Sequence, residues 1–251
     1  MQLKILAVGD VVAPTGLNYL KTVLPKLKRE KHIDFCVVNG ENAAVLGLLP
    51  QQAEEIFRAG ADVITMGNHT WGKRELVPYI DSTKGILRPA NLPPQQPGIG
   101  WDTFDTPFGQ VAVIDLIGRC AMDYTPDNPF LLVERILPKL HTKLIFVELH
   151  AEATSEKLAM GWMLDGRVSA VWGADERILP RGTGYLTDLG MTGPRDSVLG
   201  IRPELSIQKF RGDLTHRYEP APGACKLEGC IFTIDATSGR CTAAERVMLH
   251  D

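Results

Sequence analysis

The first eighty residues alternate between apolar runs and segments whose apolar residues repeat with helical spacing. The apolar runs end in polar turns, as is typical of buried strands, and they cover residues 3–10, 33–42 and 61–70. The helical segments cover residues 17–29, 50–60 and 73–80. The second of them has Pro near its start and Gly at its end, as is typical of helices. This alternation predicts a parallel sheet flanked by helices.

The second half of the chain is less regular. Residues 101–118 are typical of two strands around a Pro-Phe-Gly turn, and residues 128–140 have helical spacing. Residues 143–150 form another apolar run, residues 161–173 lead into a further strand, and the chain from Cys225 onward is typical of a β-hairpin with a Ser-Gly turn. The late strands predict a second sheet packed on the first, within a single domain that spans residues 1–251.

Polar side chains with ligand chemistry follow the predicted strands. Three successive strands end in Gly-Asp, Gly-Glu-Asn and Gly-Asn-His, and a later strand ends in a histidine. In open α/β sheets the ligand site lies beyond the carboxyl ends of the strands, so we expect these side chains to meet: Asp10, Glu41, Asn42, Asn68, His69 and His150. Taken singly, each is more often a turn, cap or structural residue; the joint pattern favours a mixed oxygen and nitrogen site for Mn²⁺, Fe or Zn²⁺.

Composition narrows the classes of partner. The chain has 251 residues and a net charge of −3, so it lacks the basic excess that binding to a nucleic-acid duplex requires. Small phosphorylated substrates remain compatible, because a bound metal can supply local positive charge. The five cysteines form no CxxC pair, and no apolar run is long enough for a signal peptide or a membrane span. We therefore expect a cytoplasmic protein with no membrane partner.

Motifs along nearly the whole chain resemble a known family. The segments "GDVV", "NGENAA", "TMGNHTW", "RPANLP", "HAEATSEK", "GWMLDGR" and "TDLGMTGP" are similar, in the same order, to the bacterial metallophosphoesterase family of the calcineurin-like superfamily, the group that includes the Bacillus protein YmdB. The resemblance implies a four-layer α/β/β/α sandwich of the metallo-dependent phosphatase type. It also implies a binuclear metal centre and phosphodiesterase activity on small phosphodiesters, notably cyclic nucleotides such as 2′,3′-cyclic AMP.

The resemblance also assigns roles to residues. His69 matches the histidine that contacts the phosphate and protonates the leaving oxygen, and Glu41 matches a carboxylate that bridges two divalent ions. The ions would be Fe or Mn, with Zn as an alternative, and their ligands would be Asp10, Glu41, Asn42, Asn68 and His150. Asn91 and Arg119 are candidate substrate contacts, with a structural role as the alternative.

The chain departs from the family at two loops. The family continues from the strand matching "SAVWG" into Gly-x-His-x-His, whose two histidines each bind one metal, whereas this chain reads "SAVWGADERILP". The segment near Val45 also lacks the His-Gly-Lys-like loop that the family has after the bridging glutamate. Either ligands have been lost, with partial metal occupancy and any single ion near His150, or the natural loop between Gly173 and Ala174 is longer than the present chain.

The loss of ligands leaves a second function open. In that alternative the chain is a weakly active or inactive regulatory protein on the same scaffold. The sequence also leaves the oligomeric state open, with a homo-oligomer among the alternatives.

Overall fold

The strand–helix alternation of the first half builds the parallel half of the first sheet. The computed structural model describes residues 1–122, 125–173, 176–213, 215 and 217–251. The parallel neighbours, in spatial order, are β1 (Gln2–Val8), β3 (Phe35–Asn39), β4 (Val63–Thr65) and β5 (Ile86–Leu87). The intervening helices are α1 (Ala13–Lys31), α2 (Pro50–Ala59) and the short α3 (Leu76–Ile80). Helix α1 begins four residues before the predicted segment, because Pro14 occupies its first turn, where no amide donor is needed.

The C-terminal hairpin completes this first sheet. The predicted hairpin is confirmed as β13 (Cys225–Asp235) and β14 (Cys241–His250), but it does not belong to the second sheet. Strand β13 pairs antiparallel with β1 over seven residue pairs, from Gln2↔Asp235 to Val8↔Gly229, because β1 otherwise has an open edge. The sheet runs in the order β2-β12-β13-β1-β3-β4-β5, with β14 beside β13. The two added short strands are β2 (Asp10–Val11) and β12 (Met191–Pro194).

The second sheet consists of the strands from the middle of the chain, in the order β10-β11-β9-β8-β7-β6. Its strands are β6 (Trp101–Thr106), β7 (Gly109–Ile117), β8 (Leu144–His150), β9 (Ala170–Trp172), β10 (Arg177–Ile178) and β11 (Gly184–Leu186). Its helices are α4 (Pro129–Ile136) and α5 (Thr154–Leu164). The predicted helix over residues 128–140 ends early in a 3₁₀ turn, Leu137–Lys139, because Pro138 cannot donate the next helical hydrogen bond.

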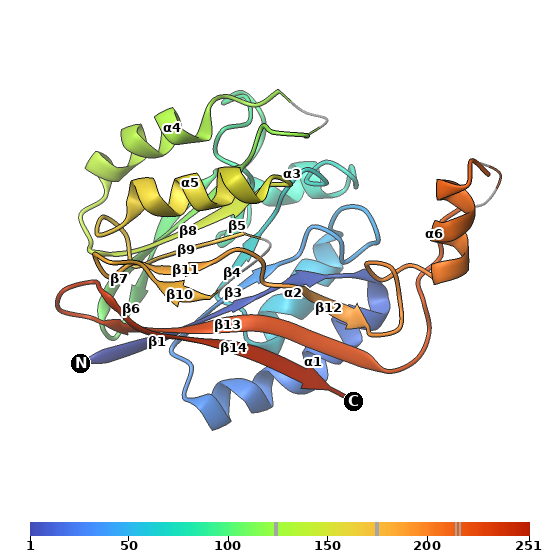
Figure 1. Ribbon diagram of the computed structural model, residues 1–251, viewed down its shortest axis with the longest axis horizontal. Coiled ribbons are helices and arrows are strands. Elements are labelled where there is room, and N and C mark those ends of the chain that lie inside the picture. The colour runs from blue at the N-terminus through green and yellow to red at the C-terminus, as the bar shows by residue number, and fades with distance from the viewer. Residues whose placement is uncertain (123–124, 174–175, 214, 216) are drawn as a thin grey trace.

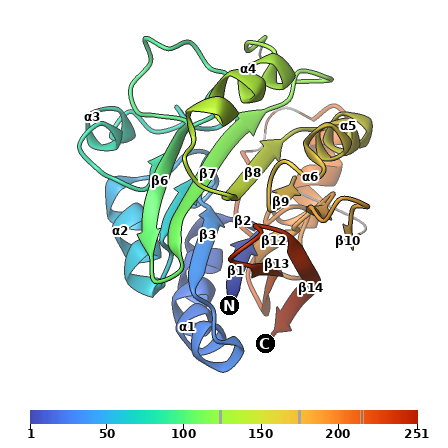
Figure 2. The same cartoon turned by 90° about the vertical axis from the view of Figure 1, so that its left-hand side faces the viewer.

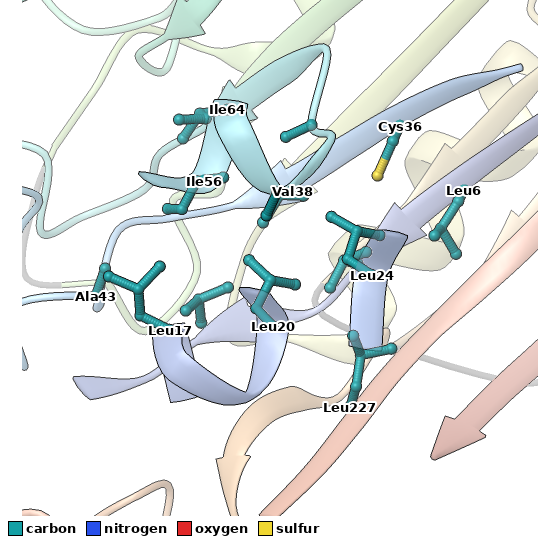
Figure 3. Close-up of a cluster of buried hydrophobic side chains, with 14 of the residues drawn as sticks. Leu6, Leu17, Leu20, Leu24, Cys36, Val38, Ala43, Ile56, Ile64 and Leu227 are labelled. Atoms are coloured by element: carbon teal, nitrogen blue, oxygen red, sulfur yellow. The ribbon is translucent and has the colours of Figure 1, made fainter. Parts of the chain in front are cut away.

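Three apolar clusters hold the layers together. Leu17, Leu20 and Leu24 of α1 pack with apolar side chains of α2 and the first sheet on its outer face (Figure 3). A second cluster fills the space between the sheets, where the rings of Trp172 and Phe232 stack 5.7 Å apart between their centroids. The third lies between the second sheet and helices α4 and α5. The order helix, sheet, sheet, helix is visible in Figures 1 and 2, so the predicted four-layer α/β/β/α sandwich is confirmed.

One helix has no counterpart in the predicted pattern. Helix α6 (Pro203–Phe210) projects away from the layers (Figure 1), and Phe210 at its end is 85% exposed. Within the described residues, no helix is both long and apolar enough to span a membrane.

Candidate metal and catalytic site

The carboxyl ends of strands from both sheets bring the six predicted side chains together. Asp10 lies in β2, Glu41 and Asn42 follow β3, Asn68 and His69 follow β4, and His150 ends β8. Hydrogen bonds and close polar contacts link all six into one cluster through Glu41 and the two asparagines. The expectation that the strand ends meet is therefore fulfilled by residues that lie far apart in the sequence.

Glu41 lies at the centre of the cluster and is 1% exposed. Its Oε1 is 3.2 Å from Nε2 of His150 and 3.4 Å from Nδ2 of Asn42. Its Oε2 accepts a hydrogen bond of 3.0 Å from the backbone N–H of His69. Both carboxylate oxygens thus face other members of the site: Oε1 lies between His150 and Asn42, and Oε2 faces the turn that carries His69.

Asn42 links Asp10 to His69. Its Nδ2 donates to Oδ2 of Asp10 at 2.7 Å, and its Oδ1 lies 2.8 Å from Nδ1 of His69. Because an amide oxygen only accepts, Nδ1 of His69 carries the proton in this pair, and Nε2 is left for a ligand or substrate. On the other side of Glu41, Oδ1 of Asn68 lies 2.9 Å from Nε2 of His150.

The charges of the site favour a cation. Oδ1 of Asp10 is buried and has no hydrogen-bond partner among the described residues. Burial raises the pKa of the Asp10 carboxyl well above its usual range, and the nearby carboxylate of Glu41 raises it further. Two carboxylates held close together and away from water are destabilised unless a positive charge compensates them. A divalent ion would supply that charge.

The donor set fits such an ion only with its amides included. Within the described part of the chain, His, Cys, Asp and Glu side chains alone form no group of three that could hold a metal ion. Two of the six side chains are asparagines, and they bond to Asp10 and His150. The amide oxygens of Asn42 and Asn68, the two carboxylates and the imidazole of His150 together form the mixed oxygen and nitrogen set that Mn²⁺, Fe or Zn²⁺ accepts.

Gly67 is a site residue that the sequence pattern did not predict. A Cβ atom at this position would lie 2.5 Å from Oε2 of Glu41 and 2.7 Å from Cγ of His150. No side chain fits between the two, so glycine allows the turn after β4 to approach both. The glycine before Asn68 and His69 in "TMGNHTW" was the available signal.

Replacing Gly67 by alanine should therefore displace Glu41 or His150 and lower kcat/KM for a phosphodiester by at least about tenfold, the scale on which small misplacements act in active sites. The fold should persist, because Gly67 lies in a turn and not in the core of a sheet. Steady-state kinetics and a circular dichroism spectrum of Gly67→Ala test this. Wild-type kinetics in the variant would show that the turn tolerates a Cβ and that Gly67 has no role in the site.

The buried carboxylate of Glu148 supports the site through hydrogen bonds to neighbouring strands. Glu148 of β8 is 4% exposed and accepts hydrogen bonds from Nδ2 of Asn39, Oγ1 of Thr65 and Nε1 of Trp172, at 2.7, 2.7 and 3.0 Å. Asn39 in turn accepts from the backbone N–H of Glu41 at 3.2 Å. Glu148 therefore joins the two sheets and positions the turn that carries Glu41. A charged residue inside the apolar run "KLIFVELH" was the signal for it.

Glu148→Ala should lower the free energy of unfolding by about 2–3 kcal/mol. Three buried donors would lose their acceptor, at roughly 1–3 kcal/mol each, and relief of the buried charge would offset part of that loss. Burial raises the pKa of Glu148, which is the sign of that unfavourable desolvation. Urea denaturation of the chelator-treated protein measures the change. The exposed pair of Glu134 and Arg167 provides a matched control, because Glu134→Ala should change stability by less than about 1 kcal/mol; equal effects of the two substitutions would contradict the role of Glu148.

The two candidate substrate contacts lie in different surroundings. Asn91 is 1% exposed, and its amide bonds only to backbone: Nδ2 donates to the carbonyls of Ile117 and Asp127, and Oδ1 accepts from the N–H of Ile117. These bonds support the structural alternative for Asn91. Arg119 has an exposed side chain, while its backbone N–H donates to Glu156 at the start of α5. A substrate contact by Arg119 stays a prediction.

The two loops at which the chain departs from the resembled family also border this site. Gly173 follows β9, and a Cβ there would lie 3.0 Å from the carbonyl oxygen of Leu149, next to His150. The predicted discontinuity between Gly173 and Ala174 falls on residues 174 and 175, which lie outside the described residues. After Glu41 the turn is tight: Val45 has a φ of 71°, a rare conformation for a β-branched residue.

Comparison with known proteins identifies the family. The profile of YmdB-like proteins matches residues 6–247. The chain belongs to the YmdB-like family. A curated relative from Bacillus subtilis, named 2′,3′-cyclic-nucleotide 2′-phosphodiesterase, is 42% identical over 259 residues, which cover 99% of this chain and 98% of the relative. That alignment is longer than the 251 residues of the chain, so the relative has internal residues with no counterpart here.

Solved structures agree with this membership of the YmdB-like family. A hypothetical protein from Thermus thermophilus has a TM-score of 0.92 at 32% identity and covers 99% of this chain and 100% of its own. A structure described as a novel phosphatase from Mycoplasma pneumoniae has the same TM-score and identity, with 100% of this chain and 94% of its own covered. The predicted resemblance, the metallophosphoesterase sandwich and the assignment of the chain as a hydrolase are thereby confirmed.

Proposed function

We propose that this chain is a metal-dependent phosphodiesterase that hydrolyses small phosphodiesters, with 2′,3′-cyclic nucleotides as the substrate class. The observation that carries the proposal is the convergence of six side chains around Glu41, with Asp10 and Asn42 on one side and Asn68 and His150 on the other. The name of the Bacillus relative supports the choice of cyclic nucleotides. We further propose that residues 1–251 act as a single metallophosphoesterase domain in the cytoplasm.

The residues divide into two ligand groups around Glu41. Asp10, Glu41 and Asn42 would hold one ion, and Glu41, Asn68 and His150 the other, with Fe or Mn favoured and Zn as the alternative. Bound divalent ions supply a nucleophilic water at neutral pH and positive charge for the phosphate oxygens. Three protein ligands suffice for a catalytic ion when water fills the other positions.

His69 performs the proton transfer in this proposal. Its Nδ1 is held by Asn42, so its Nε2 is the nitrogen that faces substrate. The attacking water gives up a proton to solvent, its oxygen forms a bond to phosphorus, and the bond from phosphorus to the 2′ oxygen breaks. The 2′ oxygen takes a proton from protonated His69, and the product is a nucleoside 3′-monophosphate.

The test is hydrolysis of 2′,3′-cyclic AMP by the purified chain loaded with Mn²⁺, followed by chromatography of the products. We expect adenosine 3′-monophosphate, and no product after chelation. A chain that holds metal by elemental analysis but releases no product would contradict the proposal and favour the alternative, a regulatory protein on the same scaffold.

A further inference from the structure

A pocket of about 180 Å³ opens beside the catalytic cluster. Three loops line it: residues 67–71 after β4, residues 92–96 after β5, and residues 125–126 after β7. Gly67 and Asn68 belong both to this side pocket and to the site, because Asn68 also bonds to His150. Whatever occupies the side pocket therefore lies next to the reacting phosphate.

The lining suits a flat ring. Trp71, Leu92, Pro93 and Pro126 contribute apolar surface, and Gln96 and Thr125 contribute polar groups. Nε1 of Trp71 donates to Oε1 of Gln96 at 2.9 Å, which fixes the indole ring and satisfies its N–H. Within the described residues the amide NH₂ of Gln96 makes no hydrogen bond, so it can donate to an acceptor on the edge of a ligand.

Hydrogen bonds within the protein fix the loops that line the side pocket. The buried guanidinium of Arg88 donates to the carbonyl oxygens of Pro89, Gln96 and Pro97, at 2.9, 3.2 and 2.8 Å. This fixes the loop that carries Leu92, Pro93 and Gln96. Asn91 joins the same loop to the wall at residues 125–126 through the carbonyl of Asp127. A preformed pocket binds without a further ordering cost.

Size decides which part of a substrate the side pocket can take. A whole drug-sized ligand needs roughly 300–1,000 Å³, more than the 180 Å³ present. An engineered apolar cavity of about 150 Å³ is known to take up benzene. The side pocket therefore accommodates one ring system and not an entire nucleotide.

We propose that the side pocket binds the nucleobase of the cyclic nucleotide, with the base stacked on Trp71 and its edge read by Gln96. The proposal rests on the proposed function, since it assigns the nucleoside end of the same substrate. Stacking of a base on an aromatic ring is sequence-tolerant, because every base has a π-face. The pocket would thus make the chain prefer nucleotides over phosphodiesters that lack a base.

The experiment compares two substrates that differ only in the base. One is 2′,3′-cyclic AMP, and the other is methyl ribofuranoside 2,3-cyclic phosphate, which has the same reacting group. Trp71→Ala should lower kcat/KM for the nucleotide by roughly 5- to 150-fold, the usual range for loss of a stacking contact, and should lower it far less for the base-free substrate. Trp71→Phe should restore part of the preference. Trp162 on α5, which is 53% exposed, provides a control, because Trp162→Ala should change neither value.

Two outcomes would overturn the proposal. An equal loss on both substrates in Trp71→Ala would mean that Trp71 only supports the fold of the turn. A wild-type chain without preference for the nucleotide would mean that the base is not bound. Calorimetric titration with adenosine 3′-monophosphate separates this from the proposed function: a wild-type chain that hydrolyses neither substrate but binds the nucleotide more tightly than Trp71→Ala would retain the pocket and lose the activity.

Discussion

His69→Ala should lower kcat for 2′,3′-cyclic AMP by about 10²–10⁴-fold, the usual contribution of a positioned general acid. The side chain of His69 is 35% exposed, and its contact with Asn42 through Nδ1 orients Nε2 away from the carboxylates. The backbone N–H of His69, and not its ring, bonds to Glu41 at 3.0 Å. Removal of the ring should therefore leave bound metal near the wild-type level.

The chemical role of His69 can be separated from a positioning role. A nitrophenolate leaving group needs no proton, so the loss in His69→Ala should shrink for nitrophenyl phosphodiesters. Kinetics across esters with different leaving groups, together with elemental analysis of each preparation, measure this. A uniform loss across leaving groups would assign His69 to substrate positioning, and loss of metal would assign it to the ligand set.

Glu41→Gln should lower the affinity for metal by more than tenfold. Residues that only orient metal ligands already contribute about 10- to 100-fold, and in the proposed centre Glu41 would contact both ions. Its Oε1 lies between the two halves of the cluster, 3.2 Å from Nε2 of His150 and 3.4 Å from Nδ2 of Asn42, and its Oε2 accepts from the N–H of His69 at 3.0 Å. Gln has the same shape, so the change removes the charge with little change in packing.

Asp10→Asn is the matched comparison for Glu41→Gln. Asp10 contacts the Asn42 side of the cluster through its hydrogen bond of 2.7 Å. Its replacement should therefore weaken the binding of one ion and leave the binding of the other unchanged. Metal content after dialysis against a fixed Mn²⁺ concentration should fall in the order wild type, Asp10→Asn, Glu41→Gln. Equal metal content in wild type and Glu41→Gln would exclude Glu41 as the bridging ligand.

Individual residues show which roles can be predicted from the local sequence pattern. Asp10, Glu41 and His150 were predicted from their places after apolar runs, because strand ends are encoded in a few consecutive residues. Asn91 lies in a motif of the same kind, yet its amide bonds only to the backbone of residues that are remote in sequence. The segment "RPANLP" does not show by itself whether its asparagine contacts a ligand or connects two loops by hydrogen bonds.

Glu148 and Gly67 were missed for a different reason. Glu148 matters because Asn39, Thr65 and Trp172 from three other strands donate to it. Gly67 matters because Glu41 and His150 leave no room for a Cβ. Both roles are properties of the packed arrangement, and a single segment carries only a weak sign of them.

The sequence by itself determined the parallel strands of the first half, the two-sheet architecture and the residues that end the strands, because hydrophobic periodicity and turn chemistry act over neighbouring residues. Only the tertiary structure decided that the C-terminal hairpin pairs with β1, that Glu41 lies between two halves of a site, and that three loops enclose a pocket beside Asn68. The pairing of the hairpin with β1, the close approach of the site residues and the enclosure of the pocket depend on residues far apart in the chain. These residues meet only once the sheets have packed together.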